Sequence, residues 1–189
     1  STAIFPTFFI AMTDAKIPFM GFSLSNSAVY SFAVAFAYLV VSFLSPVLSG
    51  IADYGGHRKL FMRIFTTLGS LCCMLLFFFD GMEHLWIGLI AFMGAATCHA
   101  GSLVFYDSYL SELVPPKRSD KLSARGYAFG YVGSVILLIT NILMIQKPDW
   151  FGFTEEMVKN HVPVRMAFFT VGAWWLGFSQ LSFAWLPKD

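Results

Sequence analysis

The stretch SNSAVYSFAVAFAYLVVSFLSPVLSGI, residues Ser25 to Ile51, contains no charged side chain in its 27 residues. It is followed closely by the compact charged turn DYGGHRK, residues Asp53 to Lys59. A helix needs about 20 apolar residues to cross about 30 Å of hydrocarbon. A water-soluble helix of this length would show a polar face, whereas residues Val34 to Leu48 offer only scattered Ser and Tyr side chains. The sequence therefore predicts a transmembrane helix that ends in a tight turn.

The composition of the whole chain agrees with a membrane protein. Hydrophobic residues make up 57% of it and charged residues 12%, against about 25% charged residues in ordinary soluble proteins. The net charge of +1 offers no basic face to displace counterions, so nucleic acid is not expected as a partner. The three cysteines show neither a zinc-ligand spacing nor a disulfide framework. We expect no metal site and no cofactor.

Gaps between the charged residues divide the chain into six apolar segments. The predicted spans are residues 1–13, 25–51, 60–79, 85–110, 124–146 and 164–187. The first segment is too short to cross a bilayer, and it lacks the basic start and the cleavage site of a signal peptide. We interpret it as the outer end of a first helix whose beginning lies outside this chain. The expected fold is an all-α integral membrane bundle of six helices over residues 1–189, with the first helix truncated and five spans complete.

The distribution of Lys and Arg predicts the orientation of this bundle. The turns after the second and fourth helices and the tail after the sixth share one side of the membrane. That side holds eight of the 12 basic residues and five acidic ones, a net charge of +3, whereas the opposite side holds four basic and six acidic residues, a net charge of −2. Cytoplasmic loops carry the excess of Lys and Arg. The more basic side is therefore expected to be cytoplasmic.

The turn after the second predicted helix resembles a known motif. Its sequence SGIADYGGHRK, residues 49–59, is similar to the loop G-x-L-A-D-R-x-G-R-[RK] between the second and third helices of the major facilitator superfamily. Asp53, Gly56 and Arg58 match this pattern, whereas Tyr54 replaces its first arginine. Two further stretches, FYDSYLSELVPP (105–116) and SARGYAFGYVGS (123–134), look like the branch that includes the autophagy-related vacuolar amino-acid effluxer and its bacterial relatives.

This resemblance implies a fold and a function for the chain. Facilitators have two six-helix halves with the substrate between them, and the chain resembles the N-terminal half of such a 12-span transporter. The resemblance implies a secondary active transporter (permease), and not an enzyme, that moves a small polar solute, with amino acids as the leading class. The expected partners are this small-molecule substrate, membrane lipid and the second six-helix half. The expected location is the bacterial inner membrane, or the vacuolar membrane if the chain is fungal.

Two alternatives stay open for the function and for the charged turn. A membrane scaffold or receptor could keep the same bundle without transporting anything. For the turn, the resemblance implies a gating motif of Asp53, Gly56, Arg58 and Lys59, in which the aspartate contacts the other half in one conformation only. Such contacts suit a two-state gate. The alternative is that these charges only reach toward the headgroups.

Polar residues inside the predicted spans are candidates for a substrate or proton pathway, because ionisable groups are costly in lipid. His99, Tyr106 and Asp107 follow a helical spacing that places them on one face of the fourth helix. A histidine beside water can carry a transported proton; alternatively, His99 is a neutral residue bonded to a neighbouring helix. Asp107 lines the pathway or pairs with Arg125 at the membrane edge. Asn141 contacts substrate or makes a hydrogen bond between helices.

The longest stretch outside the predicted spans is residues 147–164. Thr154 followed by Glu155 and Glu156 predicts a short helix there, because a threonine hydroxyl caps a helix start and acidic residues favour its first turn. The chain shows no phosphate-binding glycine loop and no spacing typical of a Ser/His/Asp triad. An ATP-driven pump is therefore not expected.

Overall fold

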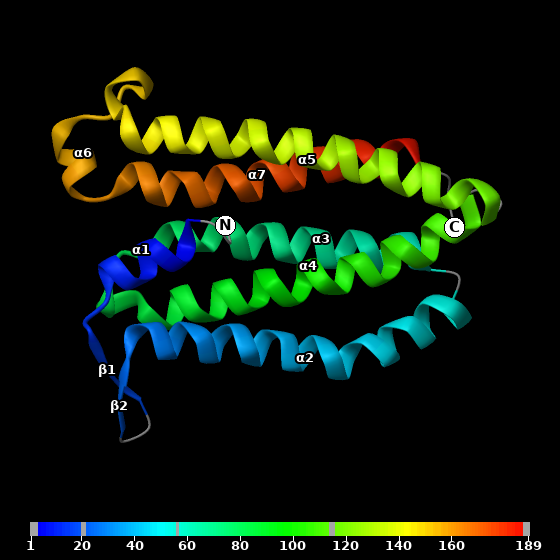
Figure 1. Cartoon of the computed structure of the whole chain (residues 1–189), viewed down its shortest axis with the longest axis horizontal. Helices are drawn as coiled ribbons and strands as arrows, with labels where there is room; N and C mark the ends of the chain where they lie inside the picture. The colour runs from blue at the N-terminus through cyan, green and yellow to red at the C-terminus, as the bar shows by residue number, and fades with distance from the viewer. Residues whose placement is uncertain (1–3, 20–21, 56, 114–115, 187–189) are drawn as a thin grey trace.

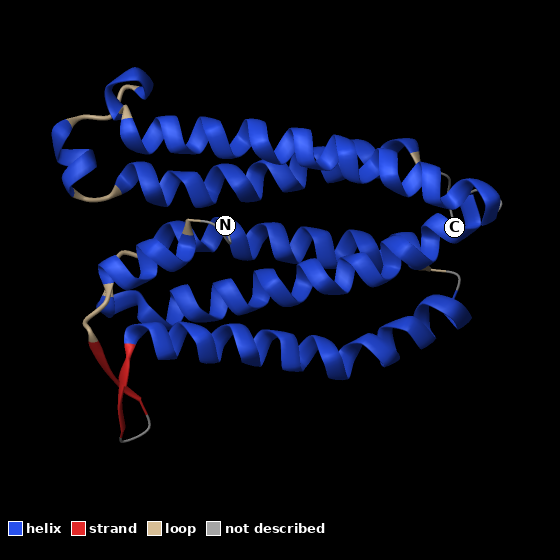
Figure 2. Cartoon of the chain, in the orientation of Figure 1, coloured by secondary structure: helices blue, strands red, loops and turns tan. Residues whose placement is uncertain are grey.

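The computed structural model describes residues 4–19, 22–55, 57–113 and 116–186; at positions 19, 52–53, 55, 110–113 and 116–119 it describes the backbone alone. The described chain is almost entirely helical, with one small hairpin (Figures 1 and 2). In chain order, its elements are α1 (Phe5–Met12), β1 (Lys16–Phe19), β2 (Phe22–Ser25), α2 (Asn26–Gly55), α3 (Arg58–Leu75), η1 (Leu76–Phe78), η2 (Met82–His84), α4 (Leu85–Leu113), α5 (Pro116–Gln146), η3 (Pro148–Phe151), α6 (Glu155–Lys159) and α7 (Val162–Trp185).

Four helical segments of the described chain are long and apolar enough to cross a membrane. They cover Asn26–Ile51, Arg58–Phe78, Met82–Tyr109 and Asp120–Gln146. This is one fewer than the five complete spans that the sequence predicts. The predicted span that is not among these four is α7. It is long enough, because its 24 residues extend about 36 Å at 1.5 Å per residue. It also contains Arg165, Gln180 and three tryptophans, which lower its mean hydropathy. The protein is an all-α membrane protein apart from its hairpin.

The five long helices lie side by side as a row (Figure 1). The row runs α2, α4, α3, α7 and α5, and each helix contacts its neighbours in that order. The two ends of the bundle differ. One end carries α1, the hairpin, η1, η2 and α6, and we call it the α6 end. The opposite end carries the C-termini of α2, α4 and α7 and the starts of α3 and α5. The helices α4, α3 and α7 therefore each have a helix on both sides.

The connection between α1 and α2 is a β-hairpin that the sequence analysis did not predict. Its strands are antiparallel, and Ile17, which faces Leu24 across them, is buried. The backbone N–H of Asn26 donates to the carbonyl of Ala15 at 3.3 Å, and the Asn26 amide donates to the carbonyl of Ile10 at 3.1 Å. One asparagine thus joins the end of α1 to the start of α2 and satisfies carbonyls that a helix end leaves free.

The helix boundaries extend beyond those expected from the charge gaps. α5 begins at Pro116, eight residues before the expected start of its span at residue 124, and includes charged residues from Asp120 to Arg125. Proline suits the first turn of a helix because it has no N–H to leave unpaired. Charged residues end a membrane span but not a helix, which continues into the headgroup layer. In α2, Pro46 lies inside the helix, and the helix bends along its length (Figure 1), as expected where a backbone hydrogen bond is missing.

The largest buried cluster of the described residues lies at the α6 end and is rich in aromatic rings. It joins α1 to the neighbouring elements through the buried side chains Phe5, Phe8, Phe9, Leu76, Phe79, Phe92 and Phe168. A second cluster toward the opposite end contains Leu48, Met62, Phe105 and Phe183. Because lipid is as apolar as these side chains, close packing rather than exclusion from water must hold the helices together.

Close approach of α7 to α3 depends on a glycine. A Cβ added at Gly172 would lie 2.6 Å from the carbonyl oxygen of Ser70 and 3.0 Å from the backbone N of Met74. Both contacts are with the backbone of α3, which cannot rotate away. Small residues at such points let two helix backbones touch in a membrane.

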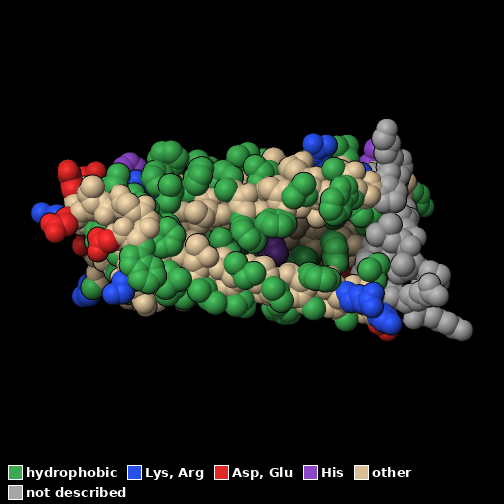
Figure 3. Space-filling model, turned by 90° about the horizontal axis from the view of Figure 1, so that it is seen from above, with side chains coloured by type: hydrophobic (Ala, Val, Ile, Leu, Met, Phe, Trp, Pro, Cys, Tyr) green, Lys and Arg blue, Asp and Glu red, His purple; other side chains and the backbone are tan. Residues whose placement is uncertain are grey.

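The predicted short helix in the loop before α7 is confirmed. It is α6, and the backbone N–H of Met157 donates to the Thr154 hydroxyl at 3.4 Å. Glu155 and Glu156 occupy its first turn, and Lys159 its last. On the face shown in Figure 3, Asp and Glu side chains gather at this end of the molecule, and hydrophobic side chains cover its long middle.

We predict that Gly172→Ala destabilises the protein by about 1–3 kcal/mol, the usual cost of overpacking. Gly177→Ala in the same helix is the matched control, because a Cβ there meets nothing within 4 Å and alanine favours a helix. Thermal unfolding of the detergent-purified full-length protein measures both variants. Equal melting temperatures for the two would contradict the close contact.

Candidate functional site

One face of α4 is open and carries polar residues. His99 and Asp107 are exposed, Tyr106 is half-buried and Leu103 between them is 36% exposed. Phe105, on another face of the same helix, is fully buried. The helical spacing thus places the three polar candidates on a side of α4 that its neighbours cover only in part. The face seen in Figure 3 is also hollowed near its middle.

The His99 ring contacts α7 by ring packing. It meets the indole of Trp175 edge to face, with ring centroids 5.6 Å apart and planes at 78°. The structure records no hydrogen bond from the His99 ring to another described residue. The interhelical hydrogen bond that the sequence analysis left open for His99 is therefore not the contact observed. An edge-to-face contact orients the ring while leaving its nitrogens available.

Tyr106 and Asp107 lie about two helical turns beyond His99 along α4. The Tyr106 hydroxyl lies against α5, where a Cβ added at Gly126 would be 3.0 Å from it. Asp107 is exposed, and no ion pair joins it to Arg125, although both side chains are described. The carboxylate of Asp107 is thus open on the same face as His99.

Asn141 lies apart from the other three candidates. Its side chain is 2% exposed, and its Oδ1 accepts a hydrogen bond of 2.8 Å from the Thr170 hydroxyl of α7. Thr170 also donates to the Ala167 carbonyl at 2.9 Å. The hydrogen bond between helices that the sequence analysis considered for Asn141 is therefore present. Asn141 joins α5 to α7.

The proposed gating turn is described only in part. Gly56 and the side chain of Asp53 lie outside the described residues. Arg58 is the first residue of α3, and its neighbour Lys59 donates through Nζ to the carbonyl of Leu186 at 2.7 Å. Leu186 follows the last residue of α7, so this bond satisfies a carbonyl at a helix C-terminus, where a positive charge is favourable. Lys59 thus joins α3 to α7 at the end opposite α6.

Arg165 makes a polar contact that the sequence analysis did not predict. Its Nε donates to the carbonyl of Phe77 at 2.6 Å, which ties α7 to η1 at the α6 end. The sequence shows Arg165 only as a single arginine at the start of a long apolar segment. The acceptor of its hydrogen bond is a backbone carbonyl 88 positions away, which no local pattern indicates. Within the described chain, no three His, Cys, Asp or Glu side chains gather as metal ligands.

Comparison with known proteins gives a consistent result. A family model described as "Vacuole effluxer Atg22 like" matches residues 11–189. The chain is 32% identical over 178 residues to the uncharacterized MFS-type transporter YxiO of Bacillus subtilis (strain 168), a match that covers 93% of this chain and 39% of YxiO. It is 23% identical over 199 residues to autophagy-related protein 22-1 of Phaeosphaeria nodorum, covering 87% of this chain and 34% of that protein.

The chain therefore spans between about a third and two-fifths of the length of these relatives. No solved structure matches it significantly. The family match covers nearly the whole chain, and the helical bundle and its membrane-spanning helices are those of an integral membrane protein. The chain belongs to the Atg22-like vacuole effluxer family, a branch of the major facilitator superfamily.

Proposed function

We propose that the chain is the N-terminal six-helix half of a secondary active transporter for a small polar solute, with amino acids as the leading class. The family supports transport, since its relatives are named as an MFS-type transporter and as Atg22 proteins. The observation that carries the proposal is the open polar face of α4. A helix among apolar neighbours has no structural use for exposed His99 and Asp107, because ionisable groups are costly in lipid.

The proposed second half covers this open face. α5 supports the same arrangement, because large apolar side chains such as Phe129, Val132 and Ile136 remain more than half exposed. In the whole transporter, the proposed substrate lies between the two halves near the middle of the membrane, and one half rocks against the other. His99, Tyr106 and Asp107 then face the aqueous pathway, whereas Asn141 holds α5 to α7 behind it.

The charged turn between α2 and α3 is the proposed gate. Asp53, Arg58 and Lys59 lie at the end opposite α6, which the distribution of Lys and Arg assigns to the cytoplasm. Gly56 belongs to the same proposed motif in the sequence. The proposed membrane is the bacterial inner membrane, as the similarity to YxiO suggests, or the vacuolar membrane if the chain is fungal. Lys59 already fixes the start of α3 to the end of α7, so a charge contact at Asp53 would act on two helices at once.

Counterflow into proteoliposomes tests the transport function. The full-length protein is reconstituted into vesicles loaded with an unlabelled amino acid, and the labelled form is added outside. We expect exchange above that of protein-free vesicles for at least one amino acid. Absence of exchange across a panel of amino acids, sugars and short peptides would favour the non-transporting scaffold instead.

We predict that Asp53→Asn shifts the protein toward its inward-open state by about 1–3 kcal/mol, the usual size of a coupling energy. The amide keeps the shape of the side chain and removes its charge. Transport should fall steeply while substrate affinity in detergent changes little. Distances between spin labels across the cytoplasmic side measure the shift.

Asp120→Asn is the control for this prediction, since Asp120 is an exposed carboxylate on the same side of the bundle. It should leave the distance distribution and transport unchanged. A distance distribution for Asp53→Asn that matches the wild type would reduce Asp53 to an ordinary interfacial charge.

His99→Gln should separate proton coupling from substrate exchange. The variant removes the titratable ring but keeps a polar side chain on the open face of α4. We expect uptake driven by a pH gradient to be lost while counterflow, which needs no proton movement, persists. Uptake and counterflow are measured in the same vesicles.

The comparison variant is Asn141→Ala, which breaks the 2.8 Å bond to Thr170. It should lower thermal stability by about 1 kcal/mol, a usual value for hydrogen bonds between membrane helices, and keep the gradient dependence. If Asn141→Ala abolishes gradient-driven uptake and His99→Gln does not, the assigned roles are reversed.

A further inference from the structure

An apolar groove runs between α3 and α7 near the α6 end. It has a volume of about 560 Å³, and every side chain that lines it is apolar: Leu71, Met74, Leu75, Phe77, Phe78, Met166 and Phe169. It lies on a different part of α7 from the Trp175 that meets His99, so it is not part of the open face of α4.

The ends of the groove are set by two contacts already described. Gly172 brings α7 against the backbone of α3 below it, and Arg165 closes the other end by its bond to the Phe77 carbonyl. Seven residues of helix separate these contacts, or about 10 Å at 1.5 Å per residue. Between them the groove is open to the surface, and Leu75 and Phe169, which line it, are each more than 40% exposed.

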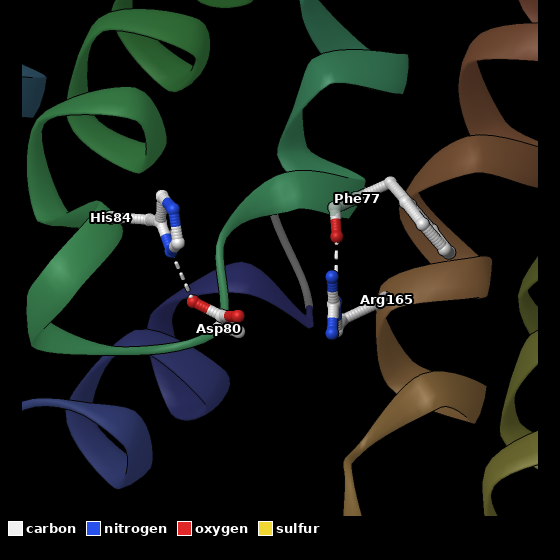
Figure 4. A network of polar contacts seen from close by, with 4 residues as sticks. All are labelled: Phe77, Asp80, His84 and Arg165. Carbon is white, nitrogen blue, oxygen red and sulfur yellow. Dashed lines mark hydrogen bonds and ion pairs between the residues drawn. The ribbon is translucent and has the colours of Figure 1, made fainter. Parts of the chain in front are cut away.

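Arg165 places a positive charge at the end of this groove. Its guanidinium carbon lies 4.9 Å from the centre of the Phe77 ring, and only its Nε is used by the Phe77 carbonyl (Figure 4). A guanidinium has five N–H donors in a planar fork. Asp80, in the same view, pairs with His84 at 2.6 Å instead. Within the described chain, the remaining guanidinium donors have no recorded acceptor.

We propose that this groove binds an anionic phospholipid, with one acyl chain between α3 and α7 and the phosphate on Arg165. The groove matches an acyl chain because its lining is wholly apolar. The arginine fork matches a phosphate, which it binds with two parallel hydrogen bonds. A free phosphate would not contact the apolar side chains that line the groove. A zwitterionic lipid would contact them but has no net negative charge to pair with Arg165. Because α3 is long and apolar enough to cross a membrane, the exposed side chains of the groove suit contact with lipid.

Native mass spectrometry of the full-length protein tests this site. The protein is purified in detergent with equal amounts of dioleoylphosphatidylglycerol and dioleoylphosphatidylcholine, and the lipid retained is counted. We expect the wild type to retain the anionic lipid preferentially. Arg165→Gln should lower that retention about fivefold, the effect of one basic residue at a membrane surface. Lys159→Gln, which removes an exposed charge from the same end, is the matched control and should change nothing.

Leu75→Trp provides a test that does not touch the arginine. The indole fills the groove, while the bond from Arg165 to Phe77 stays in place, so retention of both lipids should fall. Equal retention by Arg165→Gln and Lys159→Gln, or full retention by Leu75→Trp, would overturn the proposal. Crosslinks between two copies of the chain through cysteines placed along the groove, without bound lipid, would also overturn it and assign the groove to a second copy.

Discussion

The packing around the Phe5 ring is the interaction on which the bundle depends most. Phe5 stacks on Phe92 of α4 with centroids 4.7 Å apart, and its other neighbours are Phe79 at 5.9 Å, Phe168 of α7 at 5.8 Å and Tyr30 of α2 at 6.1 Å. In lipid, burying a ring gains nothing from leaving water, so these helices are held by van der Waals contact and ring geometry. A single side chain of a short helix thus joins three of the five long ones.

The same packing explains where the candidate site can be. At the α6 end, aromatic rings fill the space between the helices, and the polar groups there are used in structural bonds such as that of Arg165 to Phe77. Farther along α4, His99 contacts a single ring, that of Trp175, and both His99 and Asp107 remain exposed. The protein therefore separates a closely packed region, which fixes the helix positions, from an open polar face that is free to meet water or a ligand.

The features that were predictable from the sequence are those that depend on local residues. Helical spans follow from gaps between charges, because lipid offers backbone groups no partner outside a helix, and the Thr154 cap depends on three consecutive residues. The hairpin was missed because four-residue strands carry too little alternation to be recognised. The partner of Asn141 lies 29 positions away on another helix, and no local pattern encodes it.

α7 was predicted as a span, yet its Arg165 and Gln180 make it less apolar than the other helices. The role of Asp53 stays a prediction.

The bonds of Asn26 have a mechanical consequence. A flexible loop between two helices lets each turn about its own axis, but here the backbone and amide groups of Asn26 hold the carbonyls of Ala15 and Ile10, and a hydrogen-bonded ladder fills the remaining connection. Twisting α2 about its axis should therefore apply a torque to α1, because these bonds couple the start of α2 directly to the end of α1. Through Phe5, that torque reaches the centre of the aromatic cluster.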